Sequence, residues 1–203
     1  MTLVIGPPSR LPYVKQTMLH LRQKGFPQIR WLRTPGADEL KQQDPEGKPE
    51  KRLLIIYYTT LFPAVKDICA RHNCSGVFVM EDTCIVIPGI EYNDVRVDVA
   101  TCRAGVFGYG DRVLDKGDEG WNGTKGFYMT PEWCEEMTTI LRNTHLRHFL
   151  HADMWLKQLK RHGKDESFEL LRPLAGYGHR ISMTISRTDK PRWGWGMAAS
   201  LSW

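Results

Sequence analysis

The chain has 203 residues, of which 41% are hydrophobic and 25% charged, as expected for a globular protein with a core of its own. No stretch approaches the ~18 apolar residues of a membrane span, and the first residues lack the features of a secretory signal, so we expect a soluble, cytoplasmic protein with no membrane partner. The five scattered cysteines form no CxxC pair, which argues against a zinc site or a disulfide framework.

Charge is separated along the chain, which has a formal net charge of +5. Residues 1–35 contain six lysines and arginines and no acid, and residues 142–164 are again rich in basic side chains and histidines. Acids gather between these segments, in residues 81–119. This separation favours a partner that carries phosphates, either a nucleotide or a nucleic acid, although a solvated basic face without a partner gives the same pattern.

The first half of the chain shows strand and helix patterns in alternation. Apolar runs predict short strands at residues 2–5, 29–32 and 77–80. After the first strand, apolar residues recur at helical spacing until Gly25, which we expect to end that helix. Residues 60–72 predict a second helix, whose apolar face consists of Phe62, Val65, Ile68 and Cys69.

The intervening segments have weaker patterns. Residues 34–52 are polar and rich in proline, glycine and charge, so we expect an exposed loop there. Residues 53–58 favour a strand, with a helix as the alternative. Apolar or alternating patterns predict further strands at residues 84–87 and 95–102. The glycine-rich, aromatic stretch at residues 105–126 is interpreted as a loop region.

The second half begins with a clear helix start. Thr130 precedes a proline and several acids, a combination typical of the first turn of a helix. A further helix is expected to end at Gly163, followed by a strand at residues 180–187 and a basic, tryptophan-rich tail at residues 187–203. Strands that alternate with helices indicate an α/β layer fold, which we expect to form a single domain over residues 1–203.

The most informative feature of the sequence is a predicted apolar strand that is followed directly by two carboxylates. The run at residues 77–80 leads directly into Glu81 and Asp82. Ligands of open α/β sheets bind outside the carboxyl ends of the strands, so these acids stand where a ligand site is expected. Carboxylates are costly to desolvate unless they are paired, which favours a cation or a hydroxyl-rich ligand. The alternative is an ordinary polar turn.

This pattern resembles the acidic motif of the GT-A glycosyltransferases of the lipooligosaccharide and collagen-modifying type, in which an apolar strand ends in Glu-Asp-Asp. Residues 121–129 resemble the glycine-rich loop that contacts donor sugar and acceptor in that family. Residues 151–153 resemble the position of a catalytic or acceptor-contacting acid, and His179 resembles the histidine that closes over metal and diphosphate. Residues 5–10 stand in the place of the first nucleotide-binding loop.

The resemblance implies a GT-A-like (Rossmann-like) mixed sheet flanked by helices, and a hexosyltransferase whose expected donor is a UDP-sugar. The implied donor-binding residues are Gly6, Pro7, Ser9, Arg10, Glu81, Asp82, Gly123, Lys125 and Arg180. The implied acceptor-binding residues are Trp121, Asn122, His151, Trp193 and Trp195. Asp153 is the implied catalytic base. A helix cap for Asp153 and an ordinary turn position for His179 are the alternatives.

One position departs from the family pattern. Thr83 stands where the family has its last acid, usually the direct metal ligand. Asp82 and His179 still offer the oxygen and imidazole ligands that suit Mn²⁺ or Mg²⁺, so such an ion is the expected cofactor. Alternatively, basic side chains such as Arg10 and Arg180 neutralise the diphosphate in a metal-independent enzyme.

The acceptor is inferred from charge and aromatic content. The tail places Arg192 beside Trp193 and Trp195, which combines phosphate-binding charge with side chains on which bases stack. A base within a duplex has to be flipped out before it can react. By similarity to viral enzymes that decorate hydroxymethylated pyrimidines, the expected acceptor is such a base in DNA. The chain would then be a virus-encoded, DNA-modifying enzyme that acts in a host cell.

Two alternatives stay open at this point. In the first, the acceptor is a saccharide, a lipid-linked glycan or a protein side chain. In the second, the chain is a non-catalytic, basic nucleic-acid-binding module, for which Thr83 is the best argument. Other enzyme classes are disfavoured, because the sequence has no P-loop, no GxGxxG after its first strand, no GxSxG and no HExxH.

Overall fold

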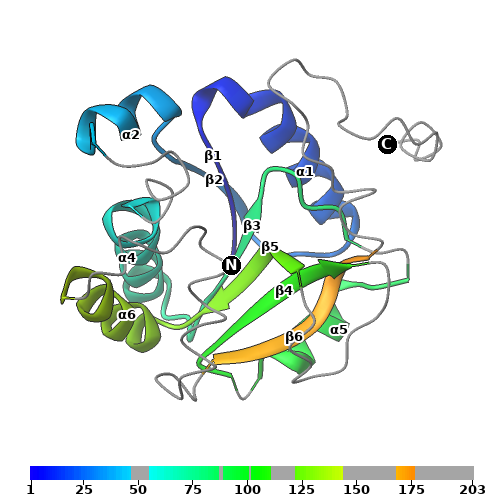
Figure 1. The fold of residues 1–203 in the computed structure, drawn as a ribbon. Coiled ribbons are helices and arrows are strands. Elements are labelled where there is room, and N and C mark those ends of the chain that lie inside the picture. The colour runs from blue at the N-terminus through cyan, green and yellow to red at the C-terminus, as the bar shows by residue number, and fades with distance from the viewer. Residues whose placement is uncertain (47–54, 87–88, 101, 111–121, 144–167, 177–203) are drawn as a thin grey trace.

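The computed structural model describes residues 1–46, 55–86, 89–100, 102–110, 122–143 and 168–176 (Figure 1). These residues form a six-stranded sheet with helices on both faces, which confirms the predicted α/β class with a mixed sheet. The strands are β1 (Thr2–Gly6), β2 (Ile29–Arg33), β3 (Val77–Glu81), β4 (Ala104–Gly110), β5 (Asn122–Met129) and β6 (Phe168–Gly176).

The strands lie in the order β2-β1-β3-β5-β4-β6. β1 pairs in parallel with both β2 and β3, β5 runs antiparallel to β3 and β4, and β4 pairs in parallel with β6. The carboxyl ends of all strands except β5 therefore lie at one edge, which we call the carboxyl edge. The amino end of β5 lies at this edge too. Because Met80 pairs with Gly126, the first four residues of β5 extend beyond the last paired residue of β3.

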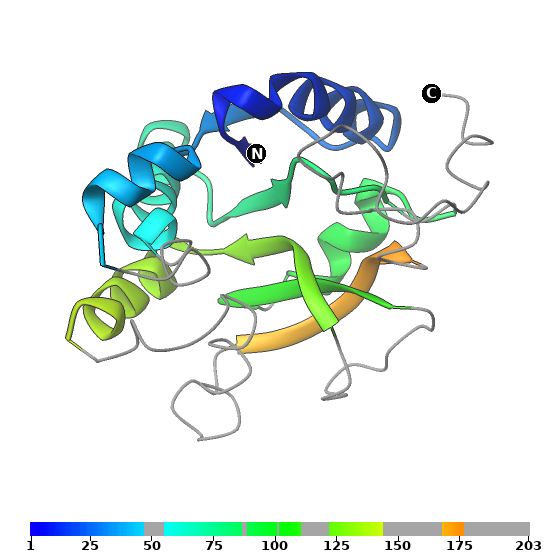
Figure 2. The same cartoon turned by 45° about the horizontal axis from the view of Figure 1, so that its top comes forward.

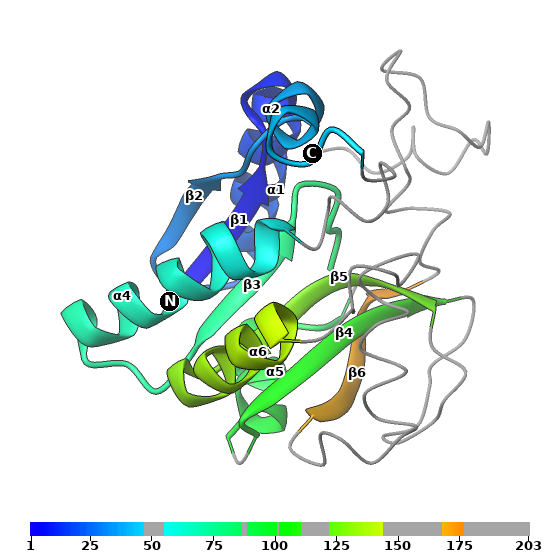
Figure 3. The ribbon, with the colours of Figure 1, turned by 60° about the vertical axis from the view of Figure 1, so that its left-hand side comes forward.

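Helices cover the sheet on both sides. Their bounds are η1, a 3₁₀ helix (Pro8–Arg10), α1 (Leu11–Gln23), α2 (Ala37–Gln43), η2, a π-helical segment (Tyr57–Leu61), α4 (Phe62–His72), α5 (Tyr92–Asp98) and α6 (Pro131–Asn143). Figures 2 and 3 show α4 and α6 on one face and α1 and α5 on the other. β1–α1–β2 and β2–α4–β3 run in opposite directions across the sheet, so right-handed crossovers place α1 and α4 on opposite faces.

The central strands are buried on both faces. Of the residues in β3, Val77 and Val79 belong to the core under α4 and α6, whereas Phe78 and Met80 belong to the core under α1 and α5. A strand that is buried on both faces is apolar at every position, and this is why a short continuous apolar run in the sequence predicts β3. Between α4 and α6, the rings of Phe62 and Trp133 pack edge to face with their centroids 5.8 Å apart.

Several predicted boundaries are confirmed. The three strands predicted at residues 2–5, 29–32 and 77–80 are β1, β2 and β3. Gly25 ends α1 with φ 76°, and its N–H donates to the carbonyl of Arg22 while that of Phe26 donates to Leu21. Thr130 caps α6, since its hydroxyl accepts the N–H of Trp133.

The segment predicted as an exposed loop at residues 34–52 contains a helix instead, so this prediction is wrong in part. Residues 37–43 form α2, and Leu40 on this helix is buried. The helix starts because the carboxylate of Glu39 accepts the N–H of Gly36 at 2.7 Å. Residues 55 and 56 are helical and lead into η2. Within residues 55–58, the structure therefore has the helix that was the alternative prediction and not the strand.

The strand predicted at residues 95–102 is wrong, because this segment contains α5. Val95, Val97 and Val99 suggested a period of two, but Val95 and Val99 are buried one helical turn apart and Val97 is 68% exposed. The carboxylate of Asp94 accepts the N–H of Glu91 at 2.9 Å, which favours a helix start.

The strand predicted at residues 84–87 is also absent from residues 84–86. Cys84 and Val86 are buried, but the N–H of Val86 donates to Nε2 of His20 on α1 rather than to a neighbouring strand. A side chain has therefore replaced the sheet ladder as the partner of this amide.

The glycine-rich stretch at residues 105–126 is not simply a loop region, because it contributes β4 and the first half of β5. Pairing with strands on both sides outweighs the low strand propensity of its glycines. β6, which contains Pro173, was not predicted from the sequence. This proline is tolerated because β6 is an edge strand and its pairing with β4 is irregular after Leu171. The helix predicted to end at Gly163, the strand at 180–187 and the tail lie outside the described residues.

None of the described helices has the length and apolar character that a bilayer span requires.

Gly76 provides a test of this packing. A Cβ at this position would lie 2.8 Å from Cε2 of Tyr128 and closer still to the phenol carbon and hydroxyl. The ring has little room to move, because it is 7% exposed and packs against Phe78 at a centroid distance of 5.2 Å. We expect Gly76→Ala to lower the free energy of unfolding by about 1–3 kcal/mol, measured by urea denaturation.

Tyr128→Leu serves as the partner variant in a double-mutant cycle. It removes the atoms with which the new methyl group collides, so Gly76→Ala should cost markedly less in the Tyr128→Leu background than in the wild-type chain. Equal costs in both backgrounds would contradict the packing described for Gly76.

Candidate functional site

The site is built where β1 and β3 end side by side. β1 leaves the sheet at Gly6 and continues into η1, whereas β3 leaves it at Glu81 and turns through Asp82 and Thr83. The chain proceeds from β1 to β2 on one side and returns to β3 on the other, so this is the point at which the strand order reverses. In open α/β sheets, ligands bind in the crevice at such a switch point, outside the carboxyl ends of the strands.

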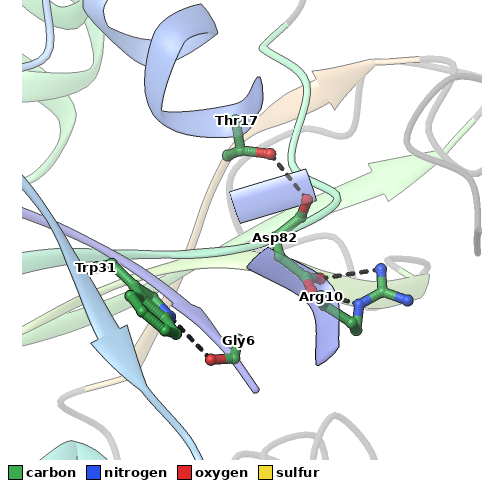
Figure 4. A network of polar contacts seen from close by, with 5 residues as sticks. All are labelled: Gly6, Arg10, Thr17, Trp31 and Asp82. Carbon is green, nitrogen blue, oxygen red and sulfur yellow. Dashed lines mark hydrogen bonds and ion pairs between the residues drawn. The ribbon is translucent and has the colours of Figure 1, made fainter. Parts of the chain in front are cut away.

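Arg10 and Asp82 form an ion pair across this switch point (Figure 4). The guanidinium of Arg10 donates from Nε to Oδ2 of Asp82 and from a terminal nitrogen to Oδ1, the second contact being 3.2 Å. The two side chains are only 27% and 11% exposed. Fork-like pairing of this kind is among the stronger polar contacts in proteins, and the same guanidinium fork also fits phosphate.

Other contacts hold the backbone on each side of the ion pair. The hydroxyl of Thr17 on α1 donates to the carbonyl of Asp82 at 2.8 Å (Figure 4). A Cβ at Gly6 would lie 2.8 Å from Cγ2 of Val14 and 3.1 Å from Oδ2 of Asp82. A larger residue at Gly6 would therefore separate β1 from α1 or displace the carboxylate. The bond from Thr17 holds the backbone of Asp82 independently of Arg10.

The carbonyl of Gly6 is held from the side of β2. It accepts the indole N–H of Trp31 at 2.9 Å (Figure 4). It also accepts the backbone N–H of Thr34 at 3.2 Å. Arg10 itself lies over the ring of Tyr13, with its guanidinium carbon 5.0 Å from the ring centroid. The carboxyl ends of β1, β2 and β3 are thus joined into one rigid frame around the ion pair.

The structure brings six of the sequence-predicted donor-binding residues to the switch point. These residues are Gly6, Pro7, Ser9, Arg10, Glu81 and Asp82. Asn122, Gly123 and Lys125 lie in the part of β5 that extends beyond β3, at the same edge of the sheet. The remaining predicted site residues, which lie outside the described part of the chain, are Trp121, His151, Asp153, His179, Arg180, Trp193 and Trp195.

The predicted metal ligands are only partly described. Asp82 has the hard oxygen atoms that Mn²⁺ and Mg²⁺ prefer, but both oxygens already accept N–H groups of Arg10, whose positive charge opposes a cation at the same carboxylate. Thr83 is half-buried in the same turn. Across the described ranges, no three His, Cys, Asp or Glu side chains gather closely enough to hold a metal ion.

Three residues of the site were not predicted from the sequence: Thr17, Trp31 and Tyr13. A signal existed for Thr17, which is a polar residue on the apolar, buried face of α1 between Val14 and Leu21. A buried hydroxyl needs a hydrogen-bond partner, so Thr17 marked a place where a backbone group had to approach the helix. Trp31 and Tyr13 gave no such signal, because their roles depend on segments that are distant in the sequence.

Comparison with known proteins gives no further information about the site: no protein-family model matches the chain, and no curated protein matches its sequence.

His20 couples α1 to the segment that follows Asp82, and it gives the structure a pH-dependent element. Burial lowers the pKa of His20 and the neighbouring charge of Lys24 lowers it further, consistent with Nε2 accepting the Val86 N–H. The unfolded chain, with an ordinary histidine pKa, therefore takes up the proton first as the pH falls. Stability contributed by neutral His20 is present above about pH 6.5 and is lost as the pH falls below that value.

We expect the free energy of unfolding, measured by urea denaturation, to decrease between pH 7.5 and 5.5. His20→Gln should reduce this decrease, because the amide oxygen of glutamine still accepts the Val86 N–H but does not titrate. His72→Gln, a change at the exposed last residue of α4, is the matched control and should leave the pH dependence unchanged. The same pH dependence in wild type and His20→Gln would refute the role of His20.

Proposed function

We propose that the chain is a GT-A-like glycosyltransferase that moves a sugar from a UDP-sugar to an acceptor hydroxyl, with a hydroxymethylated pyrimidine base in DNA as the acceptor. The observation that carries this proposal is the Arg10–Asp82 pair at the switch point of a mixed α/β sheet. The guanidinium of Arg10 can bind phosphate, and the carboxylate of Asp82 can bind a cation or a ribose hydroxyl. Both groups lie at the switch point, where nucleotides bind in such sheets.

The carboxyl edge also collects the other segments that the proposal needs. The amino end of β5 brings Asn122, Gly123 and Lys125 to this edge. β6 ends at Gly176 on the same edge, three residues before His179 and four before Arg180 in the sequence. The amino end of β5, in the glycine-rich segment, and the carboxyl end of β6, which precedes His179 in the sequence, therefore lie at the same edge of the sheet as Asp82.

The chemistry requires an acceptor oxygen to attack the anomeric carbon while the bond from that carbon to the diphosphate oxygen breaks. Asp153 takes the proton of the acceptor hydroxyl, and Arg10 with Arg180 stabilises the negative charge that develops on the leaving diphosphate. Asp82 and His179 would hold Mn²⁺ or Mg²⁺, which supplies further positive charge to the diphosphate when bound.

Exposed basic side chains support a nucleic-acid acceptor. Lys15 and Arg22 lie on the outer side of α1, and Arg30 lies on the edge strand β2. None of the three has an ion-pair partner among the described residues, whereas Lys24 pairs with Glu91 at 3.3 Å. Unpaired surface cations of this kind attract a phosphate backbone and make binding dependent on salt.

The donor is tested by thermal unfolding with a panel of nucleotides and nucleotide sugars, each with and without Mn²⁺. UDP or a UDP-sugar at 100 times its Kd should stabilise the chain by roughly 2.7 kcal/mol and raise the Tm. Gly6→Val should reduce this stabilisation, because the added side chain displaces Asp82. If no nucleotide shifts the Tm of the wild-type chain, the proposal of a donor site is wrong.

The acceptor and the base are tested together by transfer of the sugar to an oligonucleotide that contains 5-hydroxymethylcytosine. Asp153→Asn should lower the transfer rate by roughly 10²–10⁴-fold while leaving UDP affinity unchanged, because a general base acts only in the chemical step. Asp67→Asn, which alters an exposed pair on α4, is the control. Transfer to a small saccharide but not to DNA would favour the alternative acceptor class, and unchanged transfer by Asp153→Asn would remove Asp153 as the base.

A further inference from the structure

Two cysteine side chains lie in contact where α4 ends. Cys69 is on the last turn of the helix, and Cys74 follows the end of the helix by two residues. The thiol of Cys74 donates to the sulfur of Cys69, with the two sulfur atoms 3.2 Å apart. Both residues have free thiols, and Cys69 is buried in the core under α4 whereas Cys74 is half-buried at its margin.

The backbone at the end of α4 holds this contact in place. Asn73 adopts the left-handed conformation with φ 49°, and its N–H donates to the carbonyl of Cys69. The N–H of Cys74 donates to the same carbonyl at 3.3 Å. In helix ends of this kind, the side chain that follows the left-handed residue packs against the last turn of the helix. Because both side chains are cysteines here, the motif that ends the helix also brings two sulfur atoms together.

We infer that Cys69 and Cys74 are a redox-active pair that a hydroperoxide converts reversibly into a disulfide. The sulfur of Cys74 attacks a peroxide oxygen: an S–O bond forms, the O–O bond breaks, and the thiol proton leaves in a molecule of water. The sulfur of Cys69 then attacks the resulting sulfenic acid, so that an S–S bond forms and a second water leaves. Two thiols and one hydrogen peroxide thus become one disulfide and two waters, and a dithiol reductant reverses the change by exchange.

The geometry and the environment of the two sulfurs suit this order of events. To reach bonding distance, the sulfur atoms have to approach each other by only roughly 1 Å. Burial and the neighbouring thiol of Cys74 raise the pKa of Cys69 to about 12, so the less buried Cys74 is the sulfur that reacts first. The part of this shift that comes from Cys74 disappears when its thiol becomes a sulfenic acid. Cys69 then lies in contact with the sulfur that it attacks, which favours an intramolecular step.

The other cysteines are less suited to this reaction. Cys134 on α6 is fully buried, and Cys84 and Cys102 are buried in the core on the opposite face of the sheet. The disulfide would tie the last turn of α4 to the turn that leads into β3 at its amino end. This is the edge of the sheet opposite to the carboxyl edge, so the inference is independent of the proposed nucleotide site.

The test is peptide mapping of the whole chain after treatment with hydrogen peroxide, alkylation of the remaining thiols and digestion with trypsin. Cleavage after Lys66, Arg71 and Arg96 places the two cysteines in separate peptides, residues 67–71 and 72–96. We expect these peptides to be joined in peroxide-treated wild type and to be separated again by dithiothreitol. Peptide 72–96 also contains Cys84, so Cys84→Ala is the matched control and should leave the joined peptide unchanged.

Two variants separate the roles of the paired sulfurs. Cys74→Ser should lose the joined peptide. Cys69→Ala should stop at the sulfenic acid, so that dimedone labels Cys74 in this variant and labels it much less in wild type, where Cys69 consumes the intermediate. The inference is wrong if both cysteines stay alkylated under peroxide that oxidises an equal concentration of glutathione, if Cys74 proceeds to a sulfinic acid in wild type without a joined peptide, or if residues 67–71 are joined through Cys84 or Cys134.

Discussion

Parallel pairing of β1 with β2 on one side and with β3 on the other is the constraint from which the rest of the structure follows. Right-handed crossovers then place α1 and α4 on opposite faces. The chain segments that leave β1 and β3 both run along the face that α1 covers. Arg10 comes from the first segment and Asp82 from the second. Gly6 allows these segments to approach each other, since no Cβ separates β1 from Asp82.

The ion pair at this point contributes little to the stability of the fold. Partly buried ion pairs contribute little net stability, because desolvation offsets most of the attraction between the charges. The backbone around Asp82 is already held by Thr17, and the carbonyl of Gly6 by Trp31. The pair therefore adds two charged groups at the carboxyl edge to a frame that other contacts already hold, as the proposed donor site needs.

The wrong predictions share a physical cause. Val95, Val97 and Val99 alternate in the sequence, but the helix is chosen by a cap at Glu91 and by burial against α1 and the sheet. β4 and β5 contain glycines typical of loops, yet they lie in the middle of a sheet and are held by strands on both sides. Local patterns report propensity, whereas pairing partners that are distant in the sequence decide such segments.

The sequence by itself determined β1, β2 and β3, the end of α1, the start of α6, and the acids at the end of β3, because each depends on neighbouring residues and on apolar content. Arg10 and Asp82 were also recognised separately as ligand-binding candidates. Only the tertiary structure decided that they bond to each other across 72 positions of sequence. Contact between distant residues depends on the order and direction of strands, and these are set by the packing of the whole sheet rather than by any local pattern.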